Sequence, residues 1–223
     1  RLMYPLAPTM EGILTALAQG YPVLVLQNNG LSIYPLWHFA VVTGADRSKE
    51  TLWLNSGRTQ QMPLSFSVFE RTWARAGYWA TLVIEPSRIS DVLDAPVVVR
   101  ELALMEQAGA VKEAQEGFAR AVITWPERKT TWLGLASSSI KLGDNALAES
   151  TLRELVRRQP QYGAGLNNLA DLLLKAGRAQ EALPFAARAV AVLDIPATRA
   201  TLAAAHAAVA ALPSPVLAPA TVH

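Results

Sequence analysis

A period of 34 residues in the second half of the chain is the feature that most constrains its fold. Small residues recur at this interval: Gly109, Gly143 and Gly177; Ala114, Ala148 and Ala182; and Pro126 and Pro160. Each period predicts a helix that ends at the Gly, a short turn, and a second helix whose Ala packs against the first. One helix pair cannot bury its apolar stripe alone, so the pairs must stack and the array must be capped.

Other residues hold matching places within the period. The middle unit has Trp132, Leu135 and Ala136 where the next has Leu166, Leu169 and Ala170. This pattern resembles the tetratricopeptide repeat, and the resemblance covers residues 97–212 as three repeats followed by an Ala-rich capping helix at 197–212. It implies an all-α solenoid whose groove docks a peptide or protein partner. Prolines after the last helix predict that residues 213–223 form a flexible tail.

Residues 1–86 differ in composition and predict a mixed α and β domain. Helical periodicity predicts helices over 10–19, after an N-cap at Thr9, and over 65–75. Apolar runs predict strands, giving the order α-β-β-β-α-β, at 22–27, 37–42, 51–55 and 78–84. The polar stretch 44–50 suits a hairpin loop. Proline breaks predict a linker at 87–96 between this domain and the repeats.

Composition narrows the classes of function. The 223 residues carry 20 Lys and Arg against 18 Asp and Glu, scattered without a basic stripe, so nucleic-acid binding is not expected. No apolar run is long enough for a membrane span. Cysteine is absent, which excludes disulfides, thiolate metal sites and a cysteine nucleophile from these residues. Asp91 and Asp94 have no histidine at ligand spacing, so neither a metal nor a cofactor is expected.

His38 is a candidate for chemistry because it lies in an apolar strand directly after Trp37. If the hairpin pairs residues whose numbers sum to an odd value near 93 or 95, Asn55 lies opposite His38 or one pair away, on the same face. The amide would then fix the tautomer of the imidazole, as in the base-and-orienter half of a cysteine-peptidase triad. A histidine hydrogen-bonded within a sheet explains the same spacing, and Asp46 is an alternative partner.

Segments 20–28, 37–46 and 52–57 resemble the bacteriocin-processing (double-glycine) type of papain-like cysteine peptidase. Gly20-Tyr21-Pro22-Val23 is similar to its G-x-P-V strand, and His38-Phe39-Ala40-Val41-Val42 to its H-[FYW]-x-V-V strand. The resemblance covers residues 1–86 and implies an α+β fold with an antiparallel sheet, the C-terminal part of a papain-like domain. By position it implies His38 as the catalytic base, Asn55 as its orienting residue, and a substrate cleft with Gln27, Asn28 and Trp37. Asn55-Ser56 departs from the family's Asp-Pro.

The family's nucleophilic Cys and its oxyanion-hole Gln belong to a segment before the strand at Pro22, and this sequence has no match to it. We therefore expect an upstream segment carrying Cys and Gln, with this chain as the C-terminal portion of a bacterial cysteine peptidase-like protein. The alternative is a non-catalytic, peptidase-like scaffold that acts through protein–protein interaction at the repeats. Related architectures point to the bacterial cell envelope or periplasm.

Overall fold

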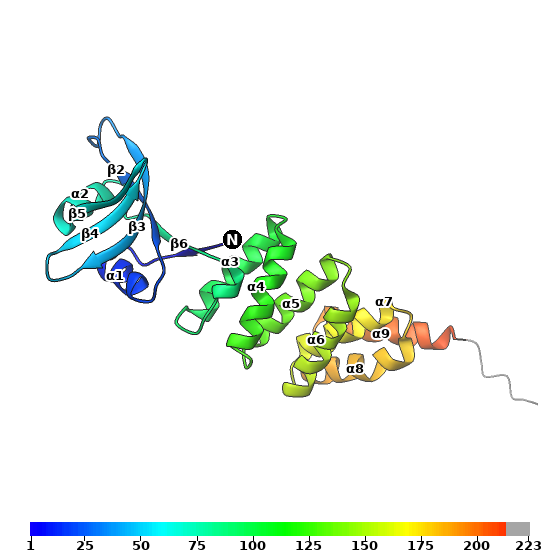
Figure 1. Cartoon of the computed structure of the whole chain (residues 1–223). Coiled ribbons are helices and arrows are strands. Elements are labelled where there is room, and N and C mark those ends of the chain that lie inside the picture. The colour runs from blue at the N-terminus through cyan, green and yellow to red at the C-terminus, as the bar shows by residue number, and fades with distance from the viewer. Residues whose placement is uncertain (213–223) are drawn as a thin grey trace, which may run out of the picture. The chain divides into compact units, whose positions relative to one another are not determined.

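The computed structural model describes residues 1–212, which divide into two compact units, the first over residues 1–131 and the second beginning at Trp132. A sheet with flanking helices forms much of the first unit, and the second is helical (Figure 1). The predicted tail at 213–223 lies outside the described residues. The mixed structure ends at Ile84 and the repeat helices begin at Ala95, near the prolines that indicate the change. A domain boundary at 87–96 stays a prediction, because the first unit continues through the first helix pair.

The elements have the following bounds. The strands are β1 (Leu2–Pro5), β2 (Val23–Asn28), β3 (Trp37–Asp46), β4 (Thr51–Ser56), β5 (Thr59–Ser65) and β6 (Ala80–Ile84). In the first unit the helices are α1 (Met10–Ala18), α2 (Phe66–Ala74), the 3-10 turn η1 (Pro86–Arg88), α3 (Ala95–Gln107) and α4 (Val111–Thr124). Next, α5 (Lys129–Lys141) straddles the division, and the second unit continues with α6 (Asn145–Arg158), α7 (Gly163–Lys175), α8 (Ala179–Val192) and α9 (Pro196–Ala210).

Within the described residues the strands form one six-stranded antiparallel sheet in the order β1-β6-β2-β3-β4-β5. The predicted antiparallel sheet is confirmed, and β1 and β5 are additional to the predicted strands. Both are edge strands with weak apolar patterns: β1 ends in Pro5, and β5 contains Gln60, Gln61 and Pro63. The hydrophobic sequence signal that marks the inner strands is therefore missing from them.

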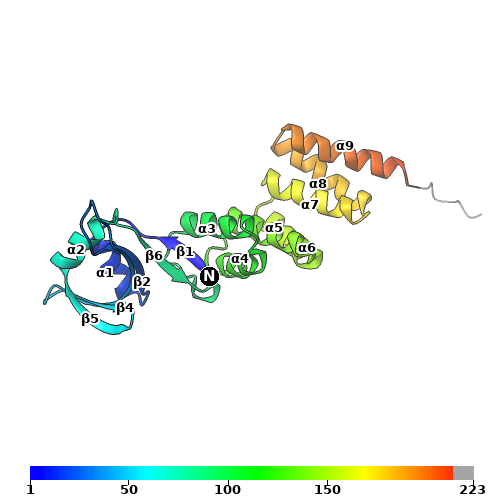
Figure 2. The ribbon, with the colours of Figure 1, turned by 90° about the horizontal axis from the view of Figure 1, so that it is seen from above.

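One face of the sheet carries the core of the first unit. Val23 pairs with Val42, which pairs with Leu54, and all three side chains are fully buried. Phe69 and Trp73 of α2 are also fully buried, because the apolar stripe of this helix faces the sheet. Figure 2 shows α1 and α2 beside the curved sheet. This face also includes Gln27 of β2 and His38 of β3, which lie opposite each other on the two paired strands.

The second unit has a core of leucine and alanine. Gly143 and Gly177 end α5 and α7 with φ values of 77° and 74°, the left-handed conformation that suits glycine at a helix end. Leu152, Leu166 and Leu169 fill the space between α6 and α7, whereas the following helices contribute small side chains: Ala182, Ala186, Ala189 and Ala205. The predicted repeat of helix pairs is confirmed. Among residues 1–212, no helix is both long and apolar enough to cross a bilayer.

Candidate functional site

His38 lies on the core face of β3 and has Ser56 as its partner. The Nε2 atom of His38 is 2.7 Å from Oγ of Ser56, which ends β4. Ala40 pairs with Ser56, so the two side chains point to the same face of the sheet. Within residues 1–212 the other ring nitrogen, Nδ1, has no hydrogen-bond partner. A serine hydroxyl at this distance fixes the orientation of the imidazole ring as an amide or carboxylate would, although it carries no charge.

Asn55 does not meet His38, and the expected odd register at this point is wrong. Near the hairpin turn the pairs do sum to an odd number, as Gly44 with Trp53 does. A β-bulge between Val42 and Gly44 then shifts the register, so that Val41 pairs with Asn55. One extra residue moves a side chain to the opposite face. Asn55 instead accepts a hydrogen bond from the backbone N–H of Gln61 at 3.0 Å.

Sequence reasoning therefore missed Ser56. The signal that would have found it is Gly44, since an isolated glycine inside a strand pattern marks a bulge. A bulge there reverses the faces of Asn55 and Ser56 relative to His38. His38 then meets the serine that follows Asn55.

The predicted cleft residues have different environments. Gln27 is buried and donates from Nε2 to Oγ1 of Thr72 at 2.6 Å, which joins β2 to α2. Asn28 is also buried, and its Oδ1 accepts from backbone N–H groups of the loop after β2. Trp37 is exposed at the start of β3. Gln27 and His38 share a face, but Gln27 is engaged with α2. A substrate cleft formed by these residues stays a prediction.

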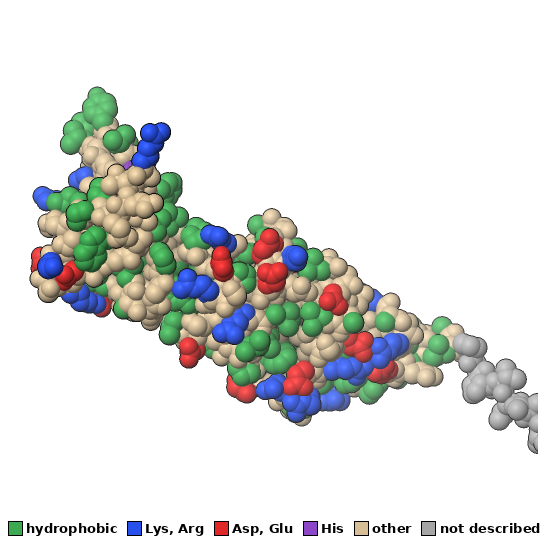
Figure 3. All heavy atoms as spheres, in the orientation of Figure 1, with side chains coloured by type: hydrophobic (Ala, Val, Ile, Leu, Met, Phe, Trp, Pro, Cys, Tyr) green, Lys and Arg blue, Asp and Glu red, His purple; other side chains and the backbone are tan. Residues whose placement is uncertain are grey.

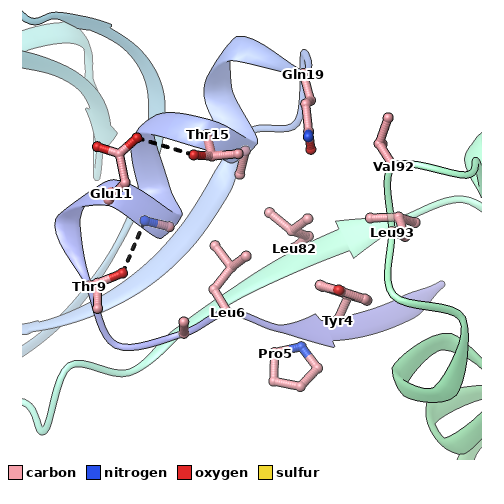
Figure 4. A pocket seen from close by; sticks show the side chains of 13 residues that line it. Tyr4, Pro5, Leu6, Thr9, Glu11, Thr15, Gln19, Leu82, Val92 and Leu93 are labelled. Atoms are coloured by element: carbon pink, nitrogen blue, oxygen red, sulfur yellow. Dashed lines mark hydrogen bonds between the residues drawn. The ribbon is translucent and has the colours of Figure 1, made fainter.

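A pocket of about 370 Å³ lies beside α1, β1 and β6 in the first unit (Figure 4). Its floor is apolar and is formed by Leu6, Leu82 and Leu93, while α1 supplies the polar rim. Two of the rim side chains already have partners: Thr9 caps the helix through the N–H of Gly12, and Glu11 forms an ion pair with Arg47 at 2.7 Å. His38 does not line this pocket. Among residues 1–212, no cluster of side chains has the composition of a metal site.

In the second unit, a cleft of about 160 Å³ lies between the end of α5, the start of α6 and α7. Asp171 and Lys175 line it, and their side chains form an ion pair at 2.7 Å. Asn167 precedes Asp171 by one helical turn, so these residues form one polar stripe on α7. Oδ1 of Asn167 is buried and has no hydrogen-bond partner among the described residues. A buried acceptor in this state costs stability unless water or a ligand donates to it.

An ion network joins α6 to the region around α8. Arg153 pairs with Glu149 at 2.9 Å and with Glu181, and Arg178 bonds both carboxylates. Burial raises the pKa of Glu149, but the hydrogen bonds from Arg153 and Arg178 outweigh it, so that pKa lies below its ordinary value. The pKa of Glu181 is lowered by its hydrogen bonds from Arg153 and Arg178. The carboxylates are therefore charged at neutral pH and tie the neighbouring helix pairs together.

Comparison with known proteins supports the repeats alone. No family model and no curated protein matches the chain. The first TPR (tetratricopeptide repeat) of Spaghetti (RPAP3), bound to the HSP90 peptide SRMEEVD, aligns with a TM-score of 0.50 and 18% identity over 54% of this chain and 97% of that chain. A thermophilic TPR protein from Thermus thermophilus aligns with a TM-score of 0.49 and 19% identity over 53% of this chain and 67% of that chain. The helical region has a tetratricopeptide-repeat-like fold.

Proposed function

We propose that the protein is a docking module whose helical repeats bind an extended segment of a partner protein. The fold supports this, because stacked helix pairs present continuous surfaces along which a chain can lie. The solved TPR of Spaghetti (RPAP3) is bound to a peptide, which makes a peptide ligand a reasonable proposal for this chain too. The observation that carries the proposal is the cleft of about 160 Å³ beside Asp171 and Lys175, which follow Asn167 on the same stripe of α7.

An asparagine side chain matches the chemistry of a peptide backbone. Its Nδ2 donates to a backbone C=O, and its buried Oδ1 accepts from a backbone N–H once the side chain turns outward, so that one side chain holds an extended peptide by two hydrogen bonds. The cleft beside Asp171 and Lys175 adds groups of both charges, and Ile140 and Leu172 add apolar surface. The stripe on α7 thus offers backbone recognition with contacts for neighbouring side chains of the ligand.

The test compares Asn167 with its neighbour Asn168, which is exposed. A peptide is selected from a random display library against the full chain, synthesised with a fluorescent label and titrated against each variant. We expect Asn167→Ala to weaken binding by about tenfold, because one or two hydrogen bonds are lost. Asn168→Ala is the matched control and should bind as the wild type does.

Stability separates a binding role from a structural role. Because Oδ1 of Asn167 has no partner to lose, Asn167→Ala should leave the free energy of unfolding unchanged or raise it slightly. If the library yields no peptide, the docking proposal fails. Equal affinities for the two variants would show that any peptide binds away from α7.

A second candidate function concerns His38 and Ser56. We propose that residues 1–86 resemble the later part of a papain-like cysteine peptidase, with His38 as base and Ser56 in place of Asn55 as the residue that orients it. The 2.7 Å contact at Nε2 supports this assignment and leaves Nδ1 for a nucleophile. The chain has no cysteine, so the catalytic Cys and the Gln would have to come from an upstream segment. Without them the domain is a scaffold.

Peptide hydrolysis by the protein isolated from its native source tests the peptidase proposal. The intact mass is compared with the 24.0 kDa of these residues, and a thiol-reactive probe is applied. In a larger, probe-labelled protein, His38→Gln should abolish hydrolysis, and Ser56→Ala should lower kcat more than it raises KM. A protein that is not labelled, or that hydrolyses peptides equally well after His38→Gln, would refute the catalytic role and leave the scaffold.

A further inference from the structure

The loop between β2 and β3 carries a cluster of exposed apolar side chains, here called the apolar tip. Its members are Leu31, Ile33, Tyr34, Leu36 and Trp37, exposed by 66%, 77%, 76%, 64% and 56%. The loop extends past the end of the sheet in Figure 1, and Figure 3 shows hydrophobic side chains gathered at that end. Exposed apolar residues are normal when scattered singly, but a contiguous group of this size marks a surface that contacts something other than water.

Hydrogen bonds and close packing hold the base of this loop. Oδ1 of Asn28 accepts from the N–H groups of Gly30 and Leu36, each at 2.9 Å. The backbone of Asn28 is held in turn by Arg75, whose Nε and Nη2 donate to its carbonyl. Gly30 is required by close packing, since a Cβ there would lie 2.4 Å from the carbonyl oxygen of Tyr34. The apolar side chains are thus presented in a fixed arrangement.

Two further hydrogen bonds join backbone groups within the loop. Asn29 donates its N–H to the carbonyl of Leu36, and Tyr34 donates to that of Leu31. Pro35, between Tyr34 and Leu36, has no N–H to satisfy. Backbone groups that enter a hydrocarbon environment must find partners within the protein, because no water is present there. These two bonds avoid part of that cost. The N–H groups of Leu31, Ser32 and Ile33 have no partner among residues 1–212 and would bond to water or to headgroup oxygens at the interface.

The charges around the apolar tip are positive. Residues 12–45 contain no Asp, Glu, Lys or Arg, so the tip has no charge of its own. Arg58 is exposed in the turn after Ser56, and Ser56 lies beside His38 at the tip end of β3. Arg75 reaches the same end through its contact with Asn28. The acidic Asp46 lies at the opposite end of β3.

We propose that the apolar tip inserts into the surface of a lipid bilayer that contains anionic headgroups. Leu31, Ile33 and Leu36 enter the boundary between headgroups and acyl chains. Tyr34 and Trp37 have the amphipathic rings that favour this interface. Arg58 contacts the anionic headgroups. The protein would lie on the membrane through this loop without spanning it. A protruding, uncharged tip on a loop anchored by Asn28, with cations behind it, fits a bilayer surface better than a flat protein contact.

Sedimentation with lipid vesicles tests the proposal. The full chain is mixed with vesicles of phosphatidylcholine and phosphatidylglycerol in equal parts, or of phosphatidylcholine alone. We expect Leu31→Ser/Ile33→Ser to lower partitioning onto both by at least about tenfold, since two apolar side chains no longer leave water. Ile123→Ser is the matched control: Ile123 is 70% exposed on α4, away from the loop.

The charge contribution has its own variant. Arg58→Gln should weaken binding to the mixed vesicles by roughly fivefold and leave binding to phosphatidylcholine alone unchanged. Circular dichroism confirms that each variant is folded. A wild-type chain that stays in the supernatant with both vesicle types overturns the proposal, as does equal binding by Leu31→Ser/Ile33→Ser. If the wild type instead forms a dimer that this double variant disrupts, with no vesicle binding, the tip is a contact between copies and the proposal is wrong.

Discussion

Gly163, the first residue of α7, lies so close to the end of α8 that a methyl group does not fit. A Cβ added there would be 2.4 Å from Cβ of Leu193, and 3.2 Å from Cδ2 of Leu193 and from Cγ2 of Val192. Carbon atoms in contact normally lie about 3.5–4.0 Å apart, so Leu193 would have to retreat by roughly 1 Å or more. Its backbone is fixed, because its N–H donates to Ala189 and its carbonyl accepts from Thr198 at 2.6 Å.

We therefore expect Gly163→Ala to destabilise the chain. Overpacking a tight site costs about 1–3 kcal/mol, and the better helix propensity of alanine returns at most about 1 kcal/mol. The 2.4 Å contact is with a Cβ, which cannot rotate away, so the cost lies in the upper part of this range, about 2–3 kcal/mol. The net loss should therefore be about 1–2 kcal/mol, which lowers the midpoint of urea unfolding by roughly 0.5–1 M. Unfolding of the full chain is followed by far-ultraviolet circular dichroism.

Gly165→Ala, in the same helix, is the control. A Cβ at Gly165 would meet side-chain atoms of Leu155 and Tyr162 at 3.1 to 3.4 Å, which small movements relieve. Its urea midpoint should stay near that of the wild type. If Gly163→Ala is as stable as Gly165→Ala, the close approach of α7 and α8 does not limit what fits there, and the packing argument is refuted.

Two further predictions concern the loop and the charges. Asn28→Ala removes the acceptor for the N–H groups of Gly30 and Leu36 and should lower the free energy of unfolding by about 1–3 kcal/mol. Amide hydrogen exchange at those two residues should accelerate. Unchanged exchange rates would show that Asn28 does not hold the loop. Hydrogen bonds from Arg157 and Arg158 lower the pKa of Glu154 from 4.5 to about 2. A carboxylate with a depressed pKa stabilises the fold above its unfolded pKa and loses that contribution as the pH falls from 4.5 to about 2. Glu154→Gln should therefore reduce the drop in thermal midpoint across this window by a small amount, because Arg157 is exposed and Glu154 is only partly buried. An identical drop would contradict the assignment.

Much of the helical region could be predicted from the sequence, whereas the partner of His38 could be predicted only with a bulge placed at Gly44. The 34-residue spacing of Gly109, Gly143 and Gly177 marks helix ends, because each of these glycines adopts a positive φ. Pairing across a hairpin depends on every residue between the turn and the site, and one bulge beside Gly44 changed the face of Asn55. The sum of residue numbers therefore predicts which residues pair close to the turn, but the prediction fails beyond a glycine that marks a bulge.

The apolar tip and Asn167 show a different limit. Leu31, Ile33 and Leu36 have the composition of a core, and only the structure shows that they point into solvent. Asn167 sits in an apolar helix that the periodicity predicts well, but a hydrogen bond that is not made leaves no trace in a sequence. Exposure and hydrogen-bond satisfaction are properties of the packed chain, so sequence patterns identify the helix and the loop without identifying what they offer to a ligand.

The small side chains of the last helices let those helices pack closely. A methyl group removes little apolar area from water, but Ala182, Ala186 and Ala189 allow α8 to lie close against α7, and Leu183 and Phe185 add partly buried apolar surface. Stability in a stacked array is a sum of neighbour terms, and a helix at the end of the described array has packing partners on one side alone. Thermal fluctuation should therefore open the array from α9 inward. A ligand bound to α7 would stabilise that helix and stop the opening there.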